Sequence, residues 1–214
     1  MNCIVTAGPT FEPLDEVRRL TNFSTGRLGT ELANFLTGRG HTVTLLLGES
    51  ATWPGERRAQ VVRRFATTKD LRAWLRACAR KPVDAIFHAA AVSDYTFGRI
   101  FTRDPAGRLR RFTPTRKIST RGGSLLVELV PTPKLIAELR GWFPRTRLVG
   151  WKFQADGARA SALRAARKQI EDCATDACVA NGPAYGKGFG LVTPQGRRHF
   201  SAEEKLFASL EGLL

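Results

Sequence analysis

Short apolar runs alternate with segments of helical periodicity along most of the chain. The runs have the length and composition of buried strands; they read IVTA, VTLLL, VVRRF, AIFHAAAV, SLLVELV, LVGWKF and ACVAN. Between several of them, apolar residues recur at three-and-four spacing, in TELANFL, LRAWLRACA, PKLIAELRGW and ALRAARKQI. This alternation predicts an α/β fold: a three-layer, Rossmann-like, mainly parallel sheet with helices on both faces.

Local patterns add detail to three of these elements. The helix over LRAWLRACA has one apolar face, so we expect four of its residues in the core: Leu71, Trp74, Leu75 and Cys78. Near the end, GFGLVTPQGRRHF predicts two short strands around a Pro-Gln-Gly turn. Ser201 and Glu204 have the spacing of a capping box before the last predicted helix, LFASLEGLL.

Length and composition indicate one globular domain, residues 1–214. Hydrophobic residues make up 43% and charged residues 25%, which argues against a disordered chain. No apolar run approaches the ~20 residues of a membrane span, and the first residues lack the pattern of a signal peptide. We therefore expect a cytoplasmic protein whose four cysteines are buried reduced thiols, with no metal site: Cys3, Cys78, Cys173 and Cys178.

The charge is strongly positive, with a formal net value of +15. Attraction to polyanions, attraction to small phosphorylated ligands and a general arginine bias all remain open explanations. Seven basic residues concentrate among Gly, Pro and Thr: Arg103, Arg108, Arg110, Arg111, Arg116, Lys117 and Arg121. This composition predicts a flexible basic loop over about 98–124, which we call the strap. Long loops in compact domains are usually functional, so we expect the strap to have a functional role.

The stretch TNFSTGRLG, residues 21–29, precedes the first predicted helix. In a parallel sheet that helix start faces the ligand crevice with free N–H groups and its positive dipole end. A capped helix with helpful glycines explains the stretch equally well. A nicotinamide-dependent reductase is disfavoured, because the chain lacks both a GxGxxG fingerprint and a Tyr-x-x-x-Lys pair.

Several motifs occur together in a fixed order. They are VTAGPTFEPLDEVRRLTNFSTGRLG, AAAVSDY, Lys117-Ile118, VPTPKLIAEL, VGWKF, DACVAN and a GFG ending. This set resembles the phosphopantothenoylcysteine synthetase (phosphopantothenate-cysteine ligase) family, known as the ligase domain of bifunctional coenzyme A biosynthesis flavoproteins. The resemblance covers nearly the whole chain, and we expect a standalone ligase with no flavin-binding decarboxylase domain in front.

The resemblance implies a two-step reaction. A nucleoside triphosphate, CTP or ATP with Mg²⁺, activates the carboxylate of 4'-phosphopantothenate as an acyl-nucleotide, and the amine of cysteine then displaces the nucleotide. Both substrates of the first step are polyanions, which suits a basic protein. The family also implies a homodimer whose subunits complete each other's sites. A membrane partner is not expected, and nucleic acid is not expected as the main partner.

The resemblance assigns roles to particular residues. Asn22 and Lys117 would be catalytic. Nucleotide binding would fall to Gly8, Ser24, Thr25, Gly26, Gly29, Ala90, Asp94, Lys152, Phe153, Lys168 and Asn181. Phosphopantothenate binding would fall to Arg18, Asn22 and Ala91, with the choice between Arg18 and Arg19 open. No residue is assigned to a metal.

Each assignment has a plainer alternative. Asn22 and Asp94 are also typical turn residues. The alternative for Lys117 is one more solvated cation in a basic run, and the alternative for Phe153 is a buried strand aromatic. Asp176 is as suited to a local ion pair as to a ligand contact. We assign no role to the three histidines.

The chain also departs from the bacterial pattern. Gln154-Ala155 replaces an acidic ending of the VGWKF motif, and Cys173 stands where a lysine is common, although Arg167 and Lys168 are retained. The choice between CTP and ATP is therefore open. Two alternatives are a paralogue that binds nucleotide without ligation, and a nucleic-acid-binding module that uses the basic loop with Phe101 and Phe112.

Overall fold

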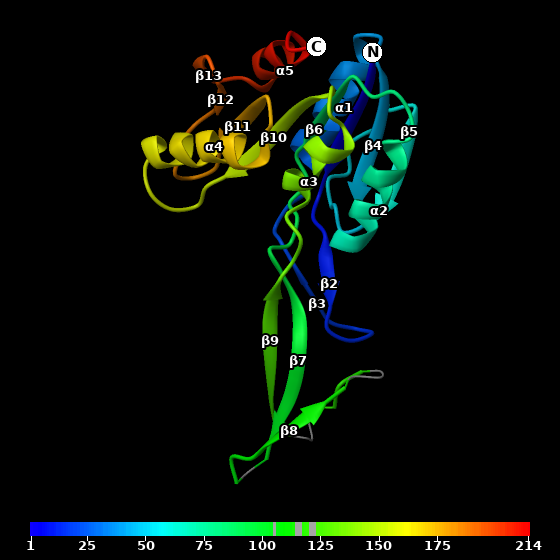
Figure 1. Cartoon of the computed structure of the whole chain (residues 1–214), viewed down its shortest axis with the longest axis vertical. Helices are drawn as coiled ribbons and strands as arrows, with labels where there is room; N and C mark the ends of the chain where they lie inside the picture. Colours follow the sequence, from blue (N-terminus) through cyan, green and yellow to red (C-terminus); the bar gives the residue numbers. More distant parts are fainter. Residues whose placement is uncertain (105, 114–116, 120–122) are drawn as a thin grey trace.

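An eight-stranded sheet forms the body of the molecule (Figure 1). The structure, a computed structural model, describes residues 1–104, 106–113, 117–119 and 123–214. Within these residues the strand order is β13-β12-β11-β10-β6-β1-β4-β5. The strands are β1 (Asn2–Ala7), β4 (Thr42–Gly48), β5 (Val61–Phe65), β6 (Ala85–His88), β10 (Arg147–Phe153), β11 (Ala177–Asn181), β12 (Phe189–Thr193) and β13 (Gly196–Phe200). Only the pairings that involve β12 and β13 are antiparallel among those of this described sheet, so the mainly parallel sheet is confirmed.

Helices cover both faces of this sheet. Alternate residues of β1 point to opposite faces: Cys3, Val5 and Ala7 pack in one cluster and Ile4 in another. The first cluster includes α1 (Arg27–Gly38) and α5 (Glu203–Glu211). The second includes α2 (Thr68–Cys78), α3 (Leu135–Trp142) and the end of α4 (Arg159–Cys173), which confirms the three-layer prediction.

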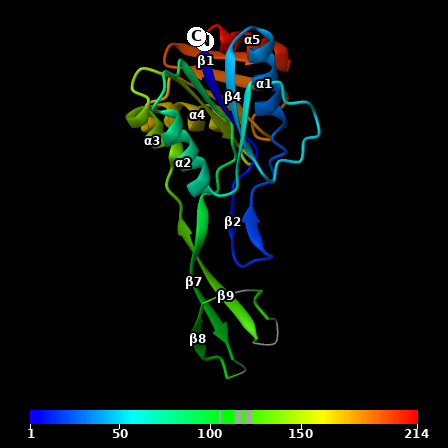
Figure 2. The ribbon, with the colours of Figure 1, turned by 90° about the vertical axis from the view of Figure 1, so that its right-hand side faces the viewer.

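A separate antiparallel arm projects from the body (Figure 2). It consists of β7 (Tyr95–Arg103), β8 (Leu109–Phe112) and β9 (Ser124–Pro131), in the order β8-β7-β9. Two predictions are corrected here. SLLVELV forms β9 of the arm and not a strand of the parallel sheet, and much of the strap expected as a loop over 98–124 is strand. Arg116 and Arg121 of the expected strap lie outside the described residues.

A short hairpin lies beside the arm. Its strands are β2 (Phe11–Pro13) and β3 (Arg19–Thr21), and Figure 1 shows them projecting from the body in the same direction as β7 and β9. Glu12 fastens the hairpin, because its buried carboxylate accepts hydrogen bonds from the Thr68 N–H at the start of α2 (3.1 Å) and from the Thr96 hydroxyl of β7 (3.1 Å).

Two local predictions fail and one is confirmed. Leu71 and Leu75 are fully buried, but Trp74 is 37% exposed and donates its indole N–H to the Arg64 carbonyl. The capping box expected at Ser201 is wrong: the N-cap of α5 is Ala202, and no side chain caps it among the described residues. The hairpin of β12 and β13 is present as predicted.

No helix within the described residues is long and apolar enough to span a bilayer. All four cysteines are free thiols; three are buried and Cys78 is half-buried. Burial raises the pKa of Cys3 to about 11 and that of Cys178 to about 12, so these thiols act as small apolar core residues.

Candidate active site

The segments that follow β1 and β6 meet at the carboxyl edge of the sheet. The Ala91 N–H donates to the Gly8 carbonyl (3.0 Å) and the Thr10 N–H donates to the Ala91 carbonyl (3.1 Å). The predicted site residues Gly8, Ala90 and Ala91 are thereby brought to one place. The carboxyl edge is where ligands bind in parallel α/β sheets.

Asn22 joins this group from the end of the β2–β3 hairpin. Its Nδ2 lies 3.2 Å from the Val92 carbonyl and 3.4 Å from the Ala91 carbonyl. The two contacts hold the amide against the segment after β6. Asn22 therefore lies next to Ala91, one of the two other residues for which the resemblance implies phosphopantothenate binding.

The start of α1 lies against the same edge and is built from glycine for a steric reason. Gly8 and Gly26 both have positive φ, 80° and 79°, which side chains disfavour. A Cβ on either residue would lie within 3.0 Å of the Ala51 Cβ. The two glycines therefore let three backbone segments pack together, whether or not a ligand binds.

The helix start still offers N–H groups to an anion. Within the described part of the chain, no side chain caps α1 at Gly26. Ser24 is half-buried and Thr25 is exposed, and the Thr25 hydroxyl lies 3.3 Å from the Arg27 nitrogen. Gly29 packs on β1, where an added Cβ would lie 2.7 Å from the Ala7 Cβ. This arrangement suits a phosphate group at the helix N-terminus.

Arg27, which the sequence analysis did not single out, is held by two carboxylates. Its guanidinium donates to Glu203 of α5 at 2.9 and 2.5 Å and to Glu31 at 2.6 Å. The hydrogen bond that Arg27 donates to Glu203 is the main cause that raises the pKa of Arg27. Arg27 thus ties the start of α1 to the start of α5. The sequence signal, an arginine four residues before a glutamate, indicated only the Glu31 pair.

A second group of predicted residues lies at the ends of β10 and β11. Phe153 and Asn181 are register partners, and the Gln154 N–H donates to the Asn181 carbonyl (2.9 Å). Phe153 is 65% exposed, so the alternative of a buried strand aromatic is wrong. The Oδ1 atom of Asn181 is buried and has no hydrogen-bond partner among the described residues. Lys152, half-buried, precedes Phe153 on β10.

Asp94 and Lys168 lie apart from these groups. Asp94 is exposed at the base of the arm, where its carbonyl accepts the Thr132 N–H (3.0 Å). The Lys168 ammonium lies 3.1 Å from Asp172 one turn along α4, and its side chain is 74% exposed. The nucleotide-binding roles of Asp94 and Lys168 stay predictions.

Lys117 lies near the tip of the hairpin. It is exposed, and the backbone of the next residue, Ile118, is hydrogen-bonded to Asp15 and Arg18. Arg18 and Arg19 are now distinguished: Arg18 contacts the strap, whereas the Arg19 guanidinium lies 4.6 Å above the Phe11 ring. The structure does not bring Lys117 beside Gly26 within one chain, since the hairpin projects away from the body (Figure 1).

His88, which the sequence analysis left without a role, lies buried at the end of β6. Burial lowers its pKa to about 4, so the ring is neutral near pH 7. Its Nδ1 lies 3.0 Å from the Thr6 hydroxyl, which also accepts the Ala90 N–H (3.0 Å). The Thr6 hydroxyl thus links the His88 ring to the Ala90 N–H, and this chain fixes the Ala90 amide at the edge of the site.

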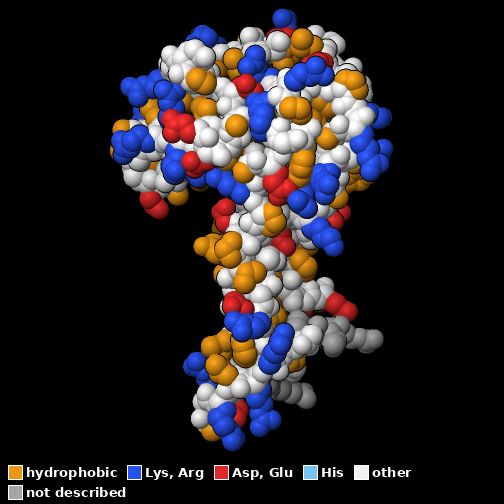
Figure 3. Space-filling model, in the orientation of Figure 1, with side chains coloured by type: hydrophobic (Ala, Val, Ile, Leu, Met, Phe, Trp, Pro, Cys, Tyr) orange, Lys and Arg blue, Asp and Glu red, His pale blue; other side chains and the backbone are white. Residues whose placement is uncertain are grey.

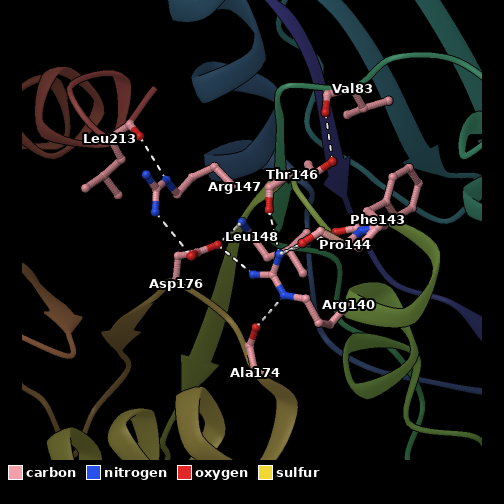
Figure 4. Close-up of polar contacts among 10 residues, drawn as sticks. All are labelled: Val83, Arg140, Phe143, Pro144, Thr146, Arg147, Leu148, Ala174, Asp176 and Leu213. Atoms are coloured by element: carbon pink, nitrogen blue, oxygen red, sulfur yellow. Dashed lines mark hydrogen bonds and ion pairs between the residues drawn. The ribbon is translucent and has the colours of Figure 1, made fainter.

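Asp176 belongs to a different place. Figure 4 shows Arg140 and Arg147 converging on its carboxylate at the amino edge of the sheet, with distances of 2.8 and 3.1 Å. The Leu148 N–H also donates to Asp176 (2.7 Å). Arg140 in addition donates to four main-chain carbonyls, those of Phe143, Pro144, Thr146 and Ala174. Asp176 is therefore a local structural partner.

No group of three or more His, Cys, Asp or Glu side chains suited to a metal ion occurs in the described residues. A divalent cation here would bind largely through the phosphate oxygens of a nucleotide, as Mg²⁺ commonly does.

Comparisons with known proteins agree on one family. A family model described as the DNA/pantothenate metabolism flavoprotein C-terminal domain matches residues 1–205. The coenzyme A biosynthesis bifunctional protein CoaBC of Thermococcus kodakarensis is 33% identical over 197 residues, which cover 91% of this chain and 44% of that protein. The chain thus spans about half the length of the curated relatives it matches.

Solved structures have the same fold. The DNA/pantothenate metabolism flavoprotein from Streptococcus pneumoniae has a TM-score of 0.84 at 26% identity, covering 99% of this chain and 97% of that one. A Cab2 mutant in complex with phosphopantothenate-cysteine has a TM-score of 0.76 at 19% identity, covering 99% and 85%.

Proposed function

Because the chain belongs to the family of the DNA/pantothenate metabolism flavoprotein C-terminal domain, we propose that it joins 4'-phosphopantothenate to cysteine. In this proposal residues 1–214 form one ligase domain of coenzyme A biosynthesis. The observation that carries it is the convergence of Gly8, Asn22 and Ala91 at the carboxyl edge, beside the uncapped start of α1. One structural neighbour was solved with phosphopantothenate-cysteine, the product of this reaction.

The reaction proceeds by two displacements. A carboxylate oxygen of phosphopantothenate attacks the α-phosphorus of CTP or ATP, the bond to the β-phosphate breaks, and pyrophosphate leaves. The amine of cysteine then attacks the acyl carbon, the nucleoside monophosphate leaves and the amine loses a proton. Mg²⁺ would enter bound to the triphosphate and would reduce its charge.

The residues of the chain have separate tasks in this scheme. The N–H groups at the start of α1 bind phosphate oxygens, and Phe153 stacks on the base while Asn181 accepts a hydrogen bond from it or from the ribose. Asn22 orients the acyl group beside Ala91. Lys117 neutralises the charge that develops as pyrophosphate leaves.

A second copy of the chain would complete this site. Phe23 is fully exposed, and Tyr95 and Leu129 on the arm are 49% and 48% exposed. Figure 3 shows hydrophobic side chains gathered along the stem of the arm. Exposed large hydrophobic side chains that lie together in this way are typical of an interface. We infer a homodimer in which the strap of one subunit, with its Lys117, approaches the helix start of the other.

Pyrophosphate release tests the proposed function directly. The pure protein should release pyrophosphate only when phosphopantothenate and a nucleoside triphosphate are both present, and cysteine should then yield the ligated product.

Lys117→Gln should lower turnover at least 100-fold, because a single charge-stabilising group is worth about 10²–10³ in kcat. A wild-type protein that releases no pyrophosphate with CTP or ATP would refute the assignment. Calorimetric titration of both nucleotides with Mg²⁺ present would decide base preference.

One observation favours a second candidate, binding of single-stranded nucleic acid by the arm. Arg103, Arg110 and Arg111 are exposed, and no ion pair involves them within the described residues. Phosphate contacts of this kind weaken steeply with salt. Binding of an oligonucleotide without any nucleoside triphosphate, lost between about 50 and 200 mM salt, would support this candidate.

A further inference from the structure

Three side chains from separate elements meet beside the loop that joins β11 to β12. The Arg159 guanidinium at the start of α4 lies 2.8 Å from Nδ1 of His199 on β13, and the Tyr185 hydroxyl of the loop lies 3.0 Å from the same nitrogen. The Cζ atom of Arg159 also lies 4.4 Å from the centroid of the Tyr185 ring, which is a cation–π distance. We call this group the Arg159–Tyr185–His199 cluster.

The donors in this cluster fix the tautomer of the imidazole. Arginine has hydrogen-bond donors and no acceptor, so Nδ1 of His199 accepts from Arg159 and the ring proton lies on Nε2. A nitrogen without a proton can only accept from the Tyr185 hydroxyl as well. The contact therefore uses a neutral His199, whose one acceptor nitrogen joins the start of α4 to the loop.

The loop has the shape that this contact needs. The Tyr185 ring is only 4% exposed and packs in the core cluster formed by α4, β11 and β12. A Cβ on Gly190 would lie 2.6 Å from this ring, and a Cβ on Gly188 would lie 2.8 Å from Cε1 of His199. Glycine at these two positions leaves room for both rings.

The same loop packs against the segment after β10, where two of the predicted nucleotide-binding residues meet. The Ala184 N–H donates to the Gln154 carbonyl (3.1 Å), and the Gln154 N–H donates to the carbonyl of Asn181 (2.9 Å). Gly182 approaches so closely that a Cβ there would lie 3.1 Å from Cδ2 of Phe153. The position of the loop therefore restricts the Phe153 ring and the backbone that carries Asn181.

We propose that Arg159, Tyr185 and His199 are positioning residues for the nucleotide base, because they hold the loop that borders Phe153 and Asn181. The inference rests on the proposed function, in which Phe153 stacks on the base and Asn181 accepts a hydrogen bond. The three residues of the cluster do not contact the base themselves. They act through the loop.

The physical reason is the cost of ordering an exposed ring. Phe153 is 65% exposed, so a base that stacks on it must also stop its motion, and this ordering opposes binding. A loop that already restricts the ring removes part of this cost and increases the affinity for a base. Inorganic triphosphate has no base, so its affinity does not depend on the loop.

Hydrogen exchange tests the contact without any ligand. His199→Phe keeps a ring but removes the acceptor, so exchange of the Ala184 amide should become about tenfold faster or more. His199→Asn keeps an acceptor, because its Oδ1 atom is bonded to Cγ in the same way as Nδ1. Exchange in this variant should stay within about threefold of the wild type.

Calorimetric titration with Mg²⁺ present separates positioning from a general effect on the site. His199→Phe and Arg159→Gln should each weaken the binding of CTP or ATP about tenfold, and His199→Asn should restore it. Inorganic triphosphate should bind to all three variants as it does to the wild type. The matched control is Arg198→Gln, because Arg198 precedes His199 on β13 but contacts Ser209 of α5. The control should leave both affinities unchanged.

The layers of inference fail in different ways. Equal exchange at Ala184 in the wild type and His199→Phe would refute the contact. Equal weakening of nucleotide and inorganic triphosphate would refute the positioning role. If Arg159→Gln weakens nucleotide binding and His199→Phe does not, Arg159 binds the ligand directly and the proposal is overturned.

The proposed function has its own outcome. A wild-type protein that binds nucleotide but releases no pyrophosphate would refute the ligase assignment, while the positioning role would still stand. A wild type that binds neither CTP nor ATP would refute both, and only the exchange result would remain. Thermal melting of each variant shows that the body remains folded in these comparisons.

Discussion

At the scale of single residues, His88 gives the clearest pH dependence. Its pKa is lowered by burial from 6.5 to about 4 in the folded state. The unfolded chain therefore takes up a proton near pH 6.5, whereas the folded chain does so only near pH 4. Stability should fall as the pH drops through this window, by about 3 kcal/mol from this group, since one pKa unit corresponds to about 1.4 kcal/mol.

The check is urea unfolding of the wild type and His88→Asn at pH 7 and pH 4.5. The asparagine amide can accept a hydrogen bond from the Thr6 hydroxyl or donate one to it, but it does not titrate. We expect the variant to lose at least 1 kcal/mol less than the wild type between the two pH values. Equal losses in both proteins would show that His88 does not titrate in the predicted window.

Gly26 allows a matched test of backbone geometry within one helix. Gly26→Ala should destabilise the protein by about 1–3 kcal/mol, because φ is 79° and the new Cβ would lie 3.0 Å from Ala51. Gly38→Ala, at the other end of α1, has no atom within 4 Å of the new Cβ and should stabilise by about 0.5–1 kcal/mol. Chemical denaturation measures both, and changes of the same sign would contradict the account.

The sequence indicated some residues of the candidate site, but it did not indicate the residues that hold them in place. Gly26 and Asn22 stand out in the sequence because glycine and asparagine favour unusual backbone geometry. His88 and Arg27 do not stand out, since their partners, Thr6 and Glu203, come from elements far away in the chain. Hydrogen bonds between residues so far apart cannot be predicted from the local sequence around either residue.

At the scale of elements, the starts of α2 and α5 allow an observed N-cap residue to be compared with one that was predicted wrongly. Thr67 caps α2 in a full capping box with Asp70, with distances of 3.1 and 2.9 Å. Thr67→Ala should therefore cost about 1 kcal/mol. Ser201→Ala should be neutral within about 0.5 kcal/mol, because the N-cap of α5 is Ala202. Thermal melting of both variants decides this, and an equal loss in both would contradict the assigned caps.

Element identity followed from the apolar pattern more reliably than element position. SLLVELV is a strand, as its composition indicates, yet it pairs with β7 in the arm. Its residues are mostly half-buried, whereas those of β6 are fully buried. Strand propensity describes a residue on a pleated surface and does not specify the partner strand. Trp74 shows the same limit for helices, since a three-and-four pattern gives a face but not its edge.

At the scale of the whole molecule, the exposed apolar surface predicts the dimer. Phe23→Ser should raise the dimer dissociation constant at least tenfold, because truncating a buried aromatic anchor costs about 2 kcal/mol or more. The matched control is Val62→Ser on the edge strand β5, where Val62 is 36% exposed and lies away from the arm. Light scattering across a dilution series measures both. A monomeric wild type, or equal effects of the two changes, would refute this interface.

Some of the positively charged residues lie on the two edge strands of the sheet, away from the candidate site. β5 carries Arg63 and Arg64, and β13 carries Arg197 and Arg198, all four of them exposed. These are the two outer strands of the eight-stranded sheet in the described residues. Charged side chains on edge strands oppose edge-to-edge association with other chains. Part of the net charge of +15 therefore has a structural explanation that needs no anionic partner.

Local patterns in the sequence were enough to predict the fold class and the family and to single out Gly8, Gly26 and Asn22, because periodicity, composition and contiguous motifs are local properties. No local pattern showed that β7 and β9 leave the body as an arm, that Asp176 lies at the amino edge or that Arg18 contacts the strap; these came from the folded chain. Each of these depends on contacts between residues 21 or more positions apart in the chain, from the Arg103–Ser124 pair of the arm upward. Such contacts are chosen by packing and by the pairing of buried polar groups, which act only once the chain is folded.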